Sequence, residues 1–354
     1  MNDAVTIAVL DGDGIGPEVV PVAVEVATRA LAAQGRTLIP IRLPYGATAI
    51  ASHGQAVPAE TLEALEEIDL WAVGPHDSAS YPPELRSPAP GAVLRKQFGL
   101  YANLRPARAH GGVPAVAADV DVLVVRENSE GLYADRNMTI GSGEFMPTPD
   151  VAMAVGVITR GACERIAVEA FDAARRRRGH VTIVHKANVL RLTTGLFRDV
   201  CFDVAQRYPD VRVDEQHVDA MAALLVRRPG DFDVIVTENL FGDILSDLAG
   251  ELSGSLGLAP SINTSATQGM AQAVHGAAPD IAGTGTANPV AMIGSVAMLL
   301  RWHGLRTSDA AVEAAADAID GALAHVLADG LATADLGGTV STGEFGAAVA
   351  AHVG

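Results

Sequence analysis

The sequence predicts an α/β protein with two lobes, and three observations lead to this fold class. The chain has 354 residues, more than one typical domain of about 100–200 residues contains. Short apolar runs typical of buried strands alternate with helical stretches along the chain. The first run passes through a glycine-rich turn into the first helix. A chain of this size needs no disulfide for its core, so Cys163 and Cys201 are expected to be small buried hydrophobes.

The elements can be justified in chain order. The first strand is expected over residues 6–10, and the helix after the glycine-rich turn opens with Pro17, which is tolerated in the first turn of a helix. A helical stretch follows at 59–68, and an alanine-rich amphipathic helix at 310–327 is assigned to packing. Further strands are expected at 37–43, 70–73, 121–125, 181–185 and 233–237.

Two segments, 74–91 and 136–149, do not fit this alternation. The first is rich in proline, and Gly141, Gly143, Pro147 and Pro149 exclude a helix from the second. Loops of this length in compact domains are usually functional or reach a partner.

Composition excludes several classes of partner. Lys and Arg total 25 against 42 Asp and Glu, which gives a net charge of −17 and disfavours binding to nucleic acid or an anionic membrane. The longest apolar run, 290–300, is shorter than the roughly 20 residues that span a bilayer. The first twenty residues hold acids and no Lys or Arg, unlike a signal peptide. We therefore expect a soluble cytoplasmic protein.

The glycine-rich turn, Gly12-Asp-Gly-Ile-Gly16, only superficially resembles a dinucleotide fingerprint. Its spacing differs, and Asp13 would place a carboxylate where a pyrophosphate should lie. A tight turn that needs positive φ is the better interpretation.

Two acids favour a metal site. Asp243 and Asp247 are four residues apart, which places both carboxylates on one helical face. Alone, such a pair is more often a helix start favoured by the dipole. The preceding run, 233–239, is typical of a buried strand and places the two acids at its carboxyl end. This position favours a metal site, because α/β proteins bind ligands at the carboxyl ends of their strands.

Three arginines, Arg95, Arg105 and Arg126, lie next to apolar residues and not in a charge run. Singly, each could pair with an acid for structural reasons. Together, beside a candidate metal site, they suggest a clamp for a di- or tricarboxylate, because a guanidinium matches a carboxylate bidentately.

Lys186 and Tyr133 are candidate proton-transfer groups. Lys186 follows a buried strand directly, so we expect partial desolvation to lower the pKa of its amine toward use as a base. Tyr133 could donate a proton. A snorkelling lysine and an amphipathic tyrosine are the simpler alternatives.

As a set, the motifs resemble those of the β-decarboxylating dehydrogenases, the family of 3-isopropylmalate, isocitrate, homoisocitrate and tartrate/D-malate dehydrogenases. They occur in the family's order over most of the chain. The motifs are Gly12-Asp-Gly-Ile-Gly-Pro-Glu18, Leu94-Arg-Lys with Leu100-Tyr-Ala-Asn-Leu-Arg-Pro106, Glu127-Asn with Gly-Leu-Tyr133, His185-Lys-Ala-Asn188, Asn239-Leu-Phe-Gly-Asp-Ile-Leu-Ser-Asp247, and His275-Gly-Ala-Ala-Pro-Asp-Ile-Ala-Gly283 with Ala287-Asn-Pro289.

The resemblance implies an isocitrate/isopropylmalate dehydrogenase-like fold with the active-site cleft between two lobes. Residues 1–100 and 250–354 would form a discontinuous cofactor-binding domain. Residues 101–249 would form a domain for dimerisation, metal and substrate, with an intersubunit arm near 134–150. The chain would be a homodimer in which Lys186 and Asp219 come from the neighbouring subunit.

The resemblance also assigns roles to the site residues. Lys186 would take the proton of the C2 hydroxyl, Tyr133 would protonate the enolate left by decarboxylation, and Asp219 would be both a catalytic group and a metal ligand. The remaining assignments are Arg95, Arg105 and Arg126 for substrate, Asp219, Asp243 and Asp247 for Mg²⁺ or Mn²⁺, and Asn188, His275, Gly276, Asp280, Ile281 and Asn288 for NAD.

The choice of NAD depends on Asp280, which follows Pro279 in the segment implied to hold the adenosine. A carboxylate accepts hydrogen bonds from ribose hydroxyls and repels a 2′-phosphate. At about 4 Å this repulsion amounts to roughly 1–4 kcal/mol, or one to three decades of preference for NAD over NADP.

The substrate interpretation depends on Pro90-Gly-Ala-Val93, where 3-isopropylmalate dehydrogenases carry a pair of leucines. Gly91 and Ala92 would leave space beside C3. We therefore expect oxidative decarboxylation of a homoisocitrate- or isocitrate-like 3-substituted (2R)-malate, with Arg86, Ser87 or Lys96 available for a distal acid. The alternatives are a 3-isopropylmalate or tartrate/D-malate dehydrogenase. A non-catalytic regulatory subunit is a third possibility, disfavoured because the catalytic and metal residues all remain.

Overall fold

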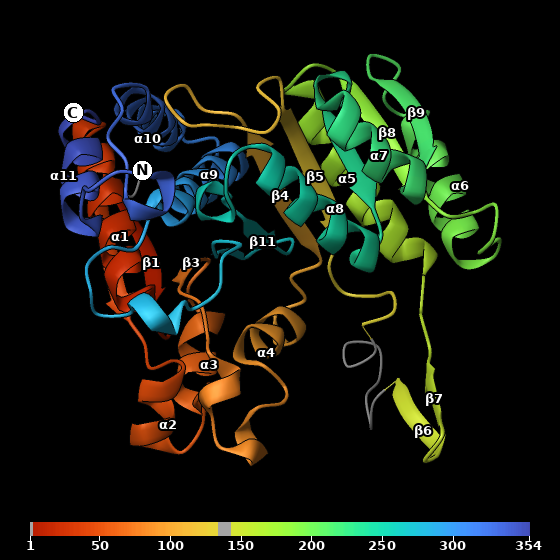
Figure 1. Ribbon diagram of the computed structural model, residues 1–354, viewed down its shortest axis with the longest axis horizontal. Helices are drawn as coiled ribbons and strands as arrows, with labels where there is room; N and C mark the ends of the chain where they lie inside the picture. The colour runs from red at the N-terminus through yellow and green to blue at the C-terminus, as the bar shows by residue number, and fades with distance from the viewer. Residues whose placement is uncertain (1–2, 134–142) are drawn as a thin grey trace. The chain divides into compact units, whose positions relative to one another are not determined.

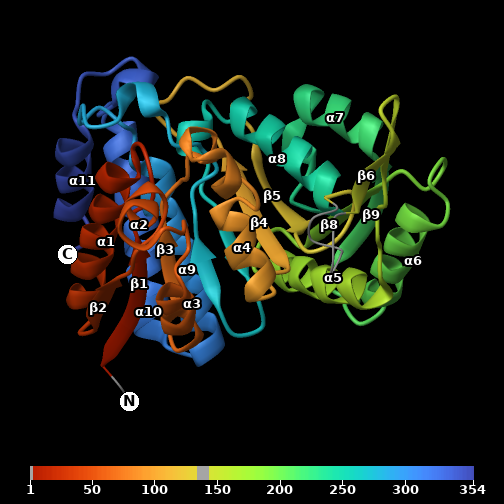
Figure 2. The same ribbon diagram turned by 90° about the horizontal axis from the view of Figure 1, so that it is seen from below.

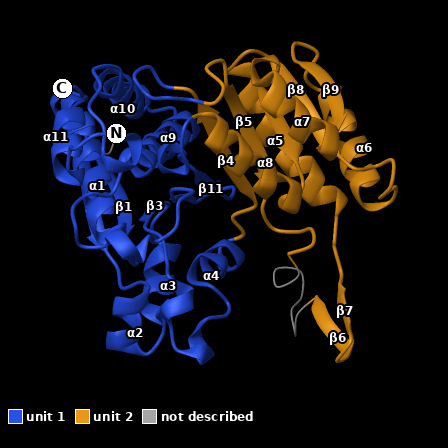
Figure 3. Cartoon of the chain, in the orientation of Figure 1, with its two compact units in different colours: residues 1–98, 110–115, 254–354 blue, residues 99–109, 116–253 orange. Residues whose placement is uncertain are grey.

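The computed structural model describes residues 3–133 and 143–354. The chain divides into two compact units (Figure 3). Unit 1 comprises Met1–Phe98, His110–Ala115 and Gly254–Gly354, and unit 2 comprises Gly99–Ala109 and Val116–Ser253. No helix among the described residues is long and apolar enough to cross a membrane.

Unit 1 is built on strands in the order β2-β1-β3-β12-β11. β1 pairs in parallel with β2 and β3, β12 pairs in parallel with β3, and β11 runs antiparallel to β12. The strands are β1 Ala4–Leu10, β2 Thr37–Arg42, β3 Leu70–Val73, β11 Ile262–Thr264 and β12 Gly269–Ala271.

The helices of unit 1 begin with α1, which packs against α9, α10 and α11 (Figure 1). The amphipathic helix expected near the chain end is confirmed as α10. Segment 74–91 is not a plain loop, because it holds two 3-10 turns, Ser78–Ser80 and Pro83–Leu85, and the start of α4. The helices are α1 Gly16–Ala33, α2 Ala47–His53, α3 Ala59–Glu66, α4 Pro90–Gln97, α9 Val290–Thr307, α10 Ala310–Ala328 and α11 Thr342–Ala351.

Unit 2 has strands in the order β4-β5-β10-β8-β9, parallel except for β4 against β5 (Figure 2). All the strands expected within it are present. The elements are β4 Ala102–Arg108, β5 Asp121–Glu127, β8 His180–His185, β9 Arg212–His217, β10 Val234–Thr237, α5 Arg160–Arg175, α6 Thr193–Ala205, α7 Val218–Arg227 and α8 Asn239–Leu252.

Both faces of this sheet are covered because its strand residues alternate in direction. Leu123 and Val125 pack with α5 and α6, in a core that also buries Cys163 and Cys201 as expected. Val122 and Val124 pack on the other face with α7 and α8. β5, β8, β9 and β10 are parallel, so the residues that follow them lie along one edge of the sheet.

The described part of segment 136–149 is not loop but strand. β6 Glu144–Thr148 pairs with β7 Val151–Ala154 as a separate antiparallel ribbon. Every residue of both strands is exposed, so no alternation of apolar and polar residues is required and no strand pattern is visible in the sequence here. Residues 134–142 of the expected arm lie outside the described residues.

Candidate active site

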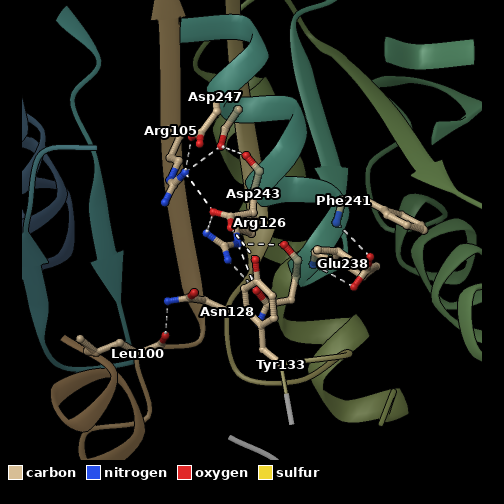
Figure 4. A network of polar contacts seen from close by, with 12 residues as sticks. Leu100, Arg105, Arg126, Asn128, Tyr133, Glu238, Phe241, Asp243 and Asp247 are labelled. Atoms are coloured by element: carbon tan, nitrogen blue, oxygen red, sulfur yellow. Dashed lines mark hydrogen bonds and ion pairs between the residues drawn. The ribbon is translucent and has the colours of Figure 1, made fainter. Parts of the chain in front are cut away.

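Arg105 and Arg126 point to the face of unit 2 that α8 covers, and the strand register explains why. In the antiparallel pair β4–β5, Asn103 lies opposite Arg126, and Arg105 lies opposite Val124. Residues opposite each other share a face, and Val124 belongs to the core beneath α7 and α8. Both guanidinium groups therefore meet the acids of α8 (Figure 4).

Arg126 is held at the first turns of α8. Its side chain is only 5% exposed, and its Nη1 donates to Asp243 Oδ1 at 2.6 Å. Nη2 donates to Asn239 Oδ1 at 2.7 Å and Nε to the Asn239 carbonyl at 2.9 Å. A Cβ on Gly242 would lie 2.5 Å from Arg126 Cγ, so glycine is needed for this close approach.

The carboxylates of Asp243 and Asp247 both contact the guanidinium group of Arg105. Arg105 Nη1 lies 3.3 Å from Asp243 Oδ1 and 3.0 Å from Asp247 Oδ1, and it also donates to Ser246 Oγ. A positive charge at one point therefore reaches both carboxylates, which fits two oxygen ligands of Mg²⁺ or Mn²⁺. Within residues 3–133 and 143–354 no three acidic, His or Cys side chains gather into a metal site.

Partial burial raises the pKa of Asp247 against the opposing charge of Arg105, and the neighbouring Asp243 raises it further. An additional cation beside Asp247 would therefore stabilise its ionised carboxylate. Tyr133 lies beside the same pair, where its hydroxyl donates to Asp243 Oδ2 at 2.6 Å. The Arg126 guanidinium lies 5.7 Å from the centre of its ring.

Lys186 and Asp219 follow the neighbouring parallel strands β8 and β9, and the lysine ammonium forms a short ion pair with the carboxylate. Asp219 is exposed, and its hydrogen bond with Lys186 lowers the pKa of its carboxyl group. Asn188, in the turn after Lys186, is also exposed. These three residues belong to unit 2, as do Tyr133, Arg105, Arg126, Asp243 and Asp247.

Arg95 lies in unit 1, on α4, so the expected three-arginine clamp is divided between the units. Its guanidinium closes over Gly91, where an added Cβ would lie 3.2 Å from Arg95 Nη1 and 3.1 Å from His76 Cε1. The space expected beside Gly91 is therefore filled, because His76 packs there from an earlier loop. Arg86, expected to be available for a distal acid, is exposed, and its Nε donates to the Tyr81 carbonyl at 2.9 Å.

The glycine-rich turn is a tight turn, as expected. Gly12 has φ of 75°, and a Cβ there would lie 2.3 Å from the Pro75 carbonyl oxygen. The buried Asp13 carboxylate accepts hydrogen bonds from the Ala47 and Asp77 amides and the Tyr81 hydroxyl. It therefore fixes the loops of unit 1 and does not mark a pyrophosphate site.

The residues assigned to NAD lie in unit 1, except for Asn188. His275 Nδ1 lies 3.0 Å from the Gly276 carbonyl and must donate to it, which leaves Nε2 as an acceptor. Nε2 is buried and has no hydrogen-bond partner within the described chain, and burial lowers the pKa of the ring. A neutral buried acceptor fits an amino group such as that of adenine.

The other assigned residues of this segment differ in their setting. Asp280 and Ile281 are exposed in the turn Pro279–Ile281, and nothing lies within 4 Å of a Cβ built on Gly276. The Gly283 amide, two residues on, donates to Glu18 on α1, which anchors the segment. Asn288 is buried, donates to Asp335 at 3.0 Å and accepts from the Val290 amide, so it supports the start of α9.

Three supporting residues were missed in the sequence. Asn239 and Gly242 orient Arg126, and Glu238 caps α8 by accepting from the Leu240 and Phe241 amides at 3.1 and 3.0 Å. The available signal was their position in the run before Asp243, since a polar residue and a glycine within one turn of a candidate ligand indicate a close approach.

Comparisons with known proteins agree with this geometry. Residues 6–349 match the isocitrate/isopropylmalate dehydrogenase family. The chain is 41% identical over 352 residues to a 3-isopropylmalate/3-methylmalate dehydrogenase of Methanocaldococcus jannaschii, covering 98% of each. It is 43% identical over 365 residues to a 3-isopropylmalate dehydrogenase of Novosphingobium aromaticivorans, covering 98% of this chain and 99% of the relative.

A solved structure is also similar. The crystal structure of isocitrate dehydrogenase from Methylococcus capsulatus has a TM-score of 0.86 at 38% identity and covers 99% of both chains. The fold and site thus define a decarboxylating dehydrogenase that acts on a CH–OH group with NAD and Mg²⁺ or Mn²⁺. The chain belongs to the isocitrate/isopropylmalate dehydrogenase family.

Proposed function

We propose that this enzyme oxidises and decarboxylates a (2R)-malate with a compact apolar substituent at C3, with 3-isopropylmalate as the best substrate. Several relatives at 41–43% identity are named 3-isopropylmalate dehydrogenases, which favours the alternative over the homoisocitrate-like interpretation. The observation that carries the choice is the packing at Gly91. His76 and Arg95 lie where a side chain at position 91 would point, and we infer that they leave room beside C3 only for a compact substituent.

His76 also compensates for the missing leucines. Burial lowers the pKa of its imidazole, and the positive charge of Arg95 lowers it further, which favours the neutral ring. On α4, Ala92 is buried one residue after Gly91. We propose that the carbon edge of the His76 ring and Ala92 face the substituent, where each buried CH₂ group contributes about 0.8 kcal/mol to binding.

In the proposed reaction Arg95, Arg105 and Arg126 bind the carboxylates of the substrate. The Lys186 amine takes the C2 hydroxyl proton as the C2 hydride passes to NAD. The bond from C3 to its carboxylate then breaks and releases CO₂, and the Tyr133 hydroxyl protonates C3 of the enolate. When bound, Mg²⁺ or Mn²⁺ supplies Lewis-acid polarisation of the C2 oxygen.

We further propose a homodimer in which Lys186 and Asp219 of one subunit complete the site of the other. Asp243 and Asp247 supply only two metal ligands, and Asp219 fits as the third. Unit 2 also presents large apolar side chains to solvent. They include Met146 and Met153 on the β6–β7 ribbon, Val226 on α7 and Ile244 on α8, each 50–62% exposed. We propose that a second subunit covers these side chains.

A substrate panel tests the proposed specificity. We expect kcat/KM for 3-isopropylmalate, with NAD and Mn²⁺, to exceed the values for homoisocitrate, isocitrate and D-malate at least tenfold, because about 1–3 kcal/mol of pocket contact separates them. His76→Ala should narrow the gap to homoisocitrate, and Arg176→Ala, an exposed helix-end change, should not. Higher kcat/KM for homoisocitrate than for 3-isopropylmalate would contradict the proposal.

A further inference from the structure

The residue before Lys186 has its own set of contacts. His185 ends β8, and its side chain is only 2% exposed. Its Nδ1 lies 3.0 Å from the Ala187 amide nitrogen, and its Nε2 lies 3.2 Å from Glu215 Oε2 on β9. The strand register places His185 beside His217, whose ring meets it edge-on at 5.4 Å between centroids.

These contacts fix the tautomer of the ring. The Ala187 amide can only donate, so Nδ1 must be the acceptor, and the carboxylate of Glu215 can only accept, so Nε2 must carry the hydrogen. The imidazole is therefore neutral and spans from the backbone just after Lys186 to the neighbouring strand. The partner atoms on both sides prevent the ring from rotating.

The remaining backbone groups around Lys186 are also engaged. The Lys186 amide donates to Thr194 Oγ1 at 3.2 Å, and its carbonyl accepts from the Val189 and Leu190 amides at 3.0 and 2.9 Å. That carbonyl belongs to the Lys186–Ala187 peptide, so His185 holds the amide side of a peptide whose carbonyl side is held by Val189 and Leu190. Without that acceptor, the buried Ala187 amide would lose its partner.

We propose that His185 is a positioning residue that sets the direction of the Lys186 side chain by accepting the hydrogen bond of the Ala187 amide. This inference rests on the proposed role of Lys186 as the base that receives the C2 hydroxyl proton. A small rotation of the Lys186–Ala187 peptide displaces the amine at the end of a long side chain, and a misplacement of about 1 Å can reduce turnover on the order of a hundredfold.

Two substitutions test the hydrogen bonds of the His185 ring, at Nδ1 and at Nε2, one at a time. His185→Asn keeps an acceptor at the place of Nδ1, whereas His185→Gln carries its amide one bond further, toward Glu215. His180→Gln is the matched control, because His180 lies at the other end of β8 and pairs with Asp214 on β9 at 3.0 Å. Hydrogen exchange of the Ala187 amide provides a readout besides activity.

We expect His185→Asn to keep kcat within about threefold and to protect the Ala187 amide, while His185→Gln lowers kcat at least about tenfold and speeds exchange at Ala187. His180→Gln should leave both unchanged. If His185→Gln does not fold, His185→Leu, an apolar replacement for a buried site, should give the same loss. Equal kcat and equal Ala187 exchange in the Asn variant and in the Gln or Leu variant would overturn the proposal.

A separate variant tests the proposed role of Lys186 as the base. Lys186→Ala should abolish turnover, and an active Lys186→Ala enzyme would remove Lys186 from the mechanism. Exchange at Ala187 in the His185 variants does not depend on that result, because it reports the hydrogen bond itself.

Discussion

At the scale of single residues, the site is organised by arginine side chains placed against carboxylates. Arg126 is nearly buried and contacts Asn239 and Asp243 through three nitrogens. Arg105 bridges Asp243 and Asp247. A lysine would reproduce the charge at either position but not the planar set of donors. The cationic groups are thus rigid before a substrate or metal binds, which reduces the ordering that binding requires.

The preference for NAD can be tested at Asp280, which is exposed in the turn Pro279–Ile281. We expect the wild-type enzyme to prefer NAD over NADP by one to three decades in kcat/KM, because a carboxylate repels a 2′-phosphate by roughly 1–4 kcal/mol. Asp280→Lys should narrow this ratio. Asp329→Lys, an exposed change of the same charge at the end of α10, is the control and should leave the ratio unchanged.

At the scale of elements, helix α8 carries the acids, and its start is fixed by a buried carboxylate. Glu238 is 5% exposed and caps the helix through two amides. Burial raises the pKa of its carboxyl group, although those amides and the charge of Arg126 oppose the shift. Its ionised form is therefore less favourable in the folded chain than in the unfolded one.

This shift gives stability a defined dependence on pH. Because the folded pKa of Glu238 is above the unfolded value of about 4.3, the native state binds more protons in the window between them, and the free energy of unfolding falls as pH rises through it. Glu238→Gln keeps an acceptor but cannot ionise. Urea unfolding should show wild type losing stability relative to this variant as the pH rises above the unfolded pKa of about 4.3. The opposite slope would mean that ionisation strengthens the cap more than burial opposes it.

The elements also show what sequence could and could not predict. The buried strands at 121–125 and 181–185 and the spacing of Asp243 and Asp247 were predictable, because local periodicity determines them. The filling of the space at Gly91 by His76 was not, since it depends on packing between separate segments. Likewise, Arg105 and Arg126 share a face only through the register of β4 with β5, which no local pattern encodes.

At the scale of the whole molecule, the contacts described above join the candidate groups of unit 2 into two sets. Tyr133, Arg126 and Asp243 meet at α8, and Lys186 meets Asp219 at the ends of β8 and β9. The set at α8 contains no proposed base. The set at the ends of β8 and β9 contains none of the arginines proposed to bind the substrate. A two-fold dimer can supply both, because each subunit gives its partner what it receives.

Mixed dimers test this arrangement. Lys186→Ala and Asp243→Ala should each be inactive as homodimers, but a mixed dimer collects both lesions in one site and leaves the other intact. Refolding equal amounts together makes about half of the dimers mixed, each with one of two sites restored, so activity should return to about a quarter of wild type. Refolding Lys186→Ala with Asp219→Ala is the control, because both lesions lie on the same side of each site and no intact site can form. If mixed dimers are demonstrated and remain inactive, the base and the metal-binding acids act within one chain, or the two sites cannot work independently.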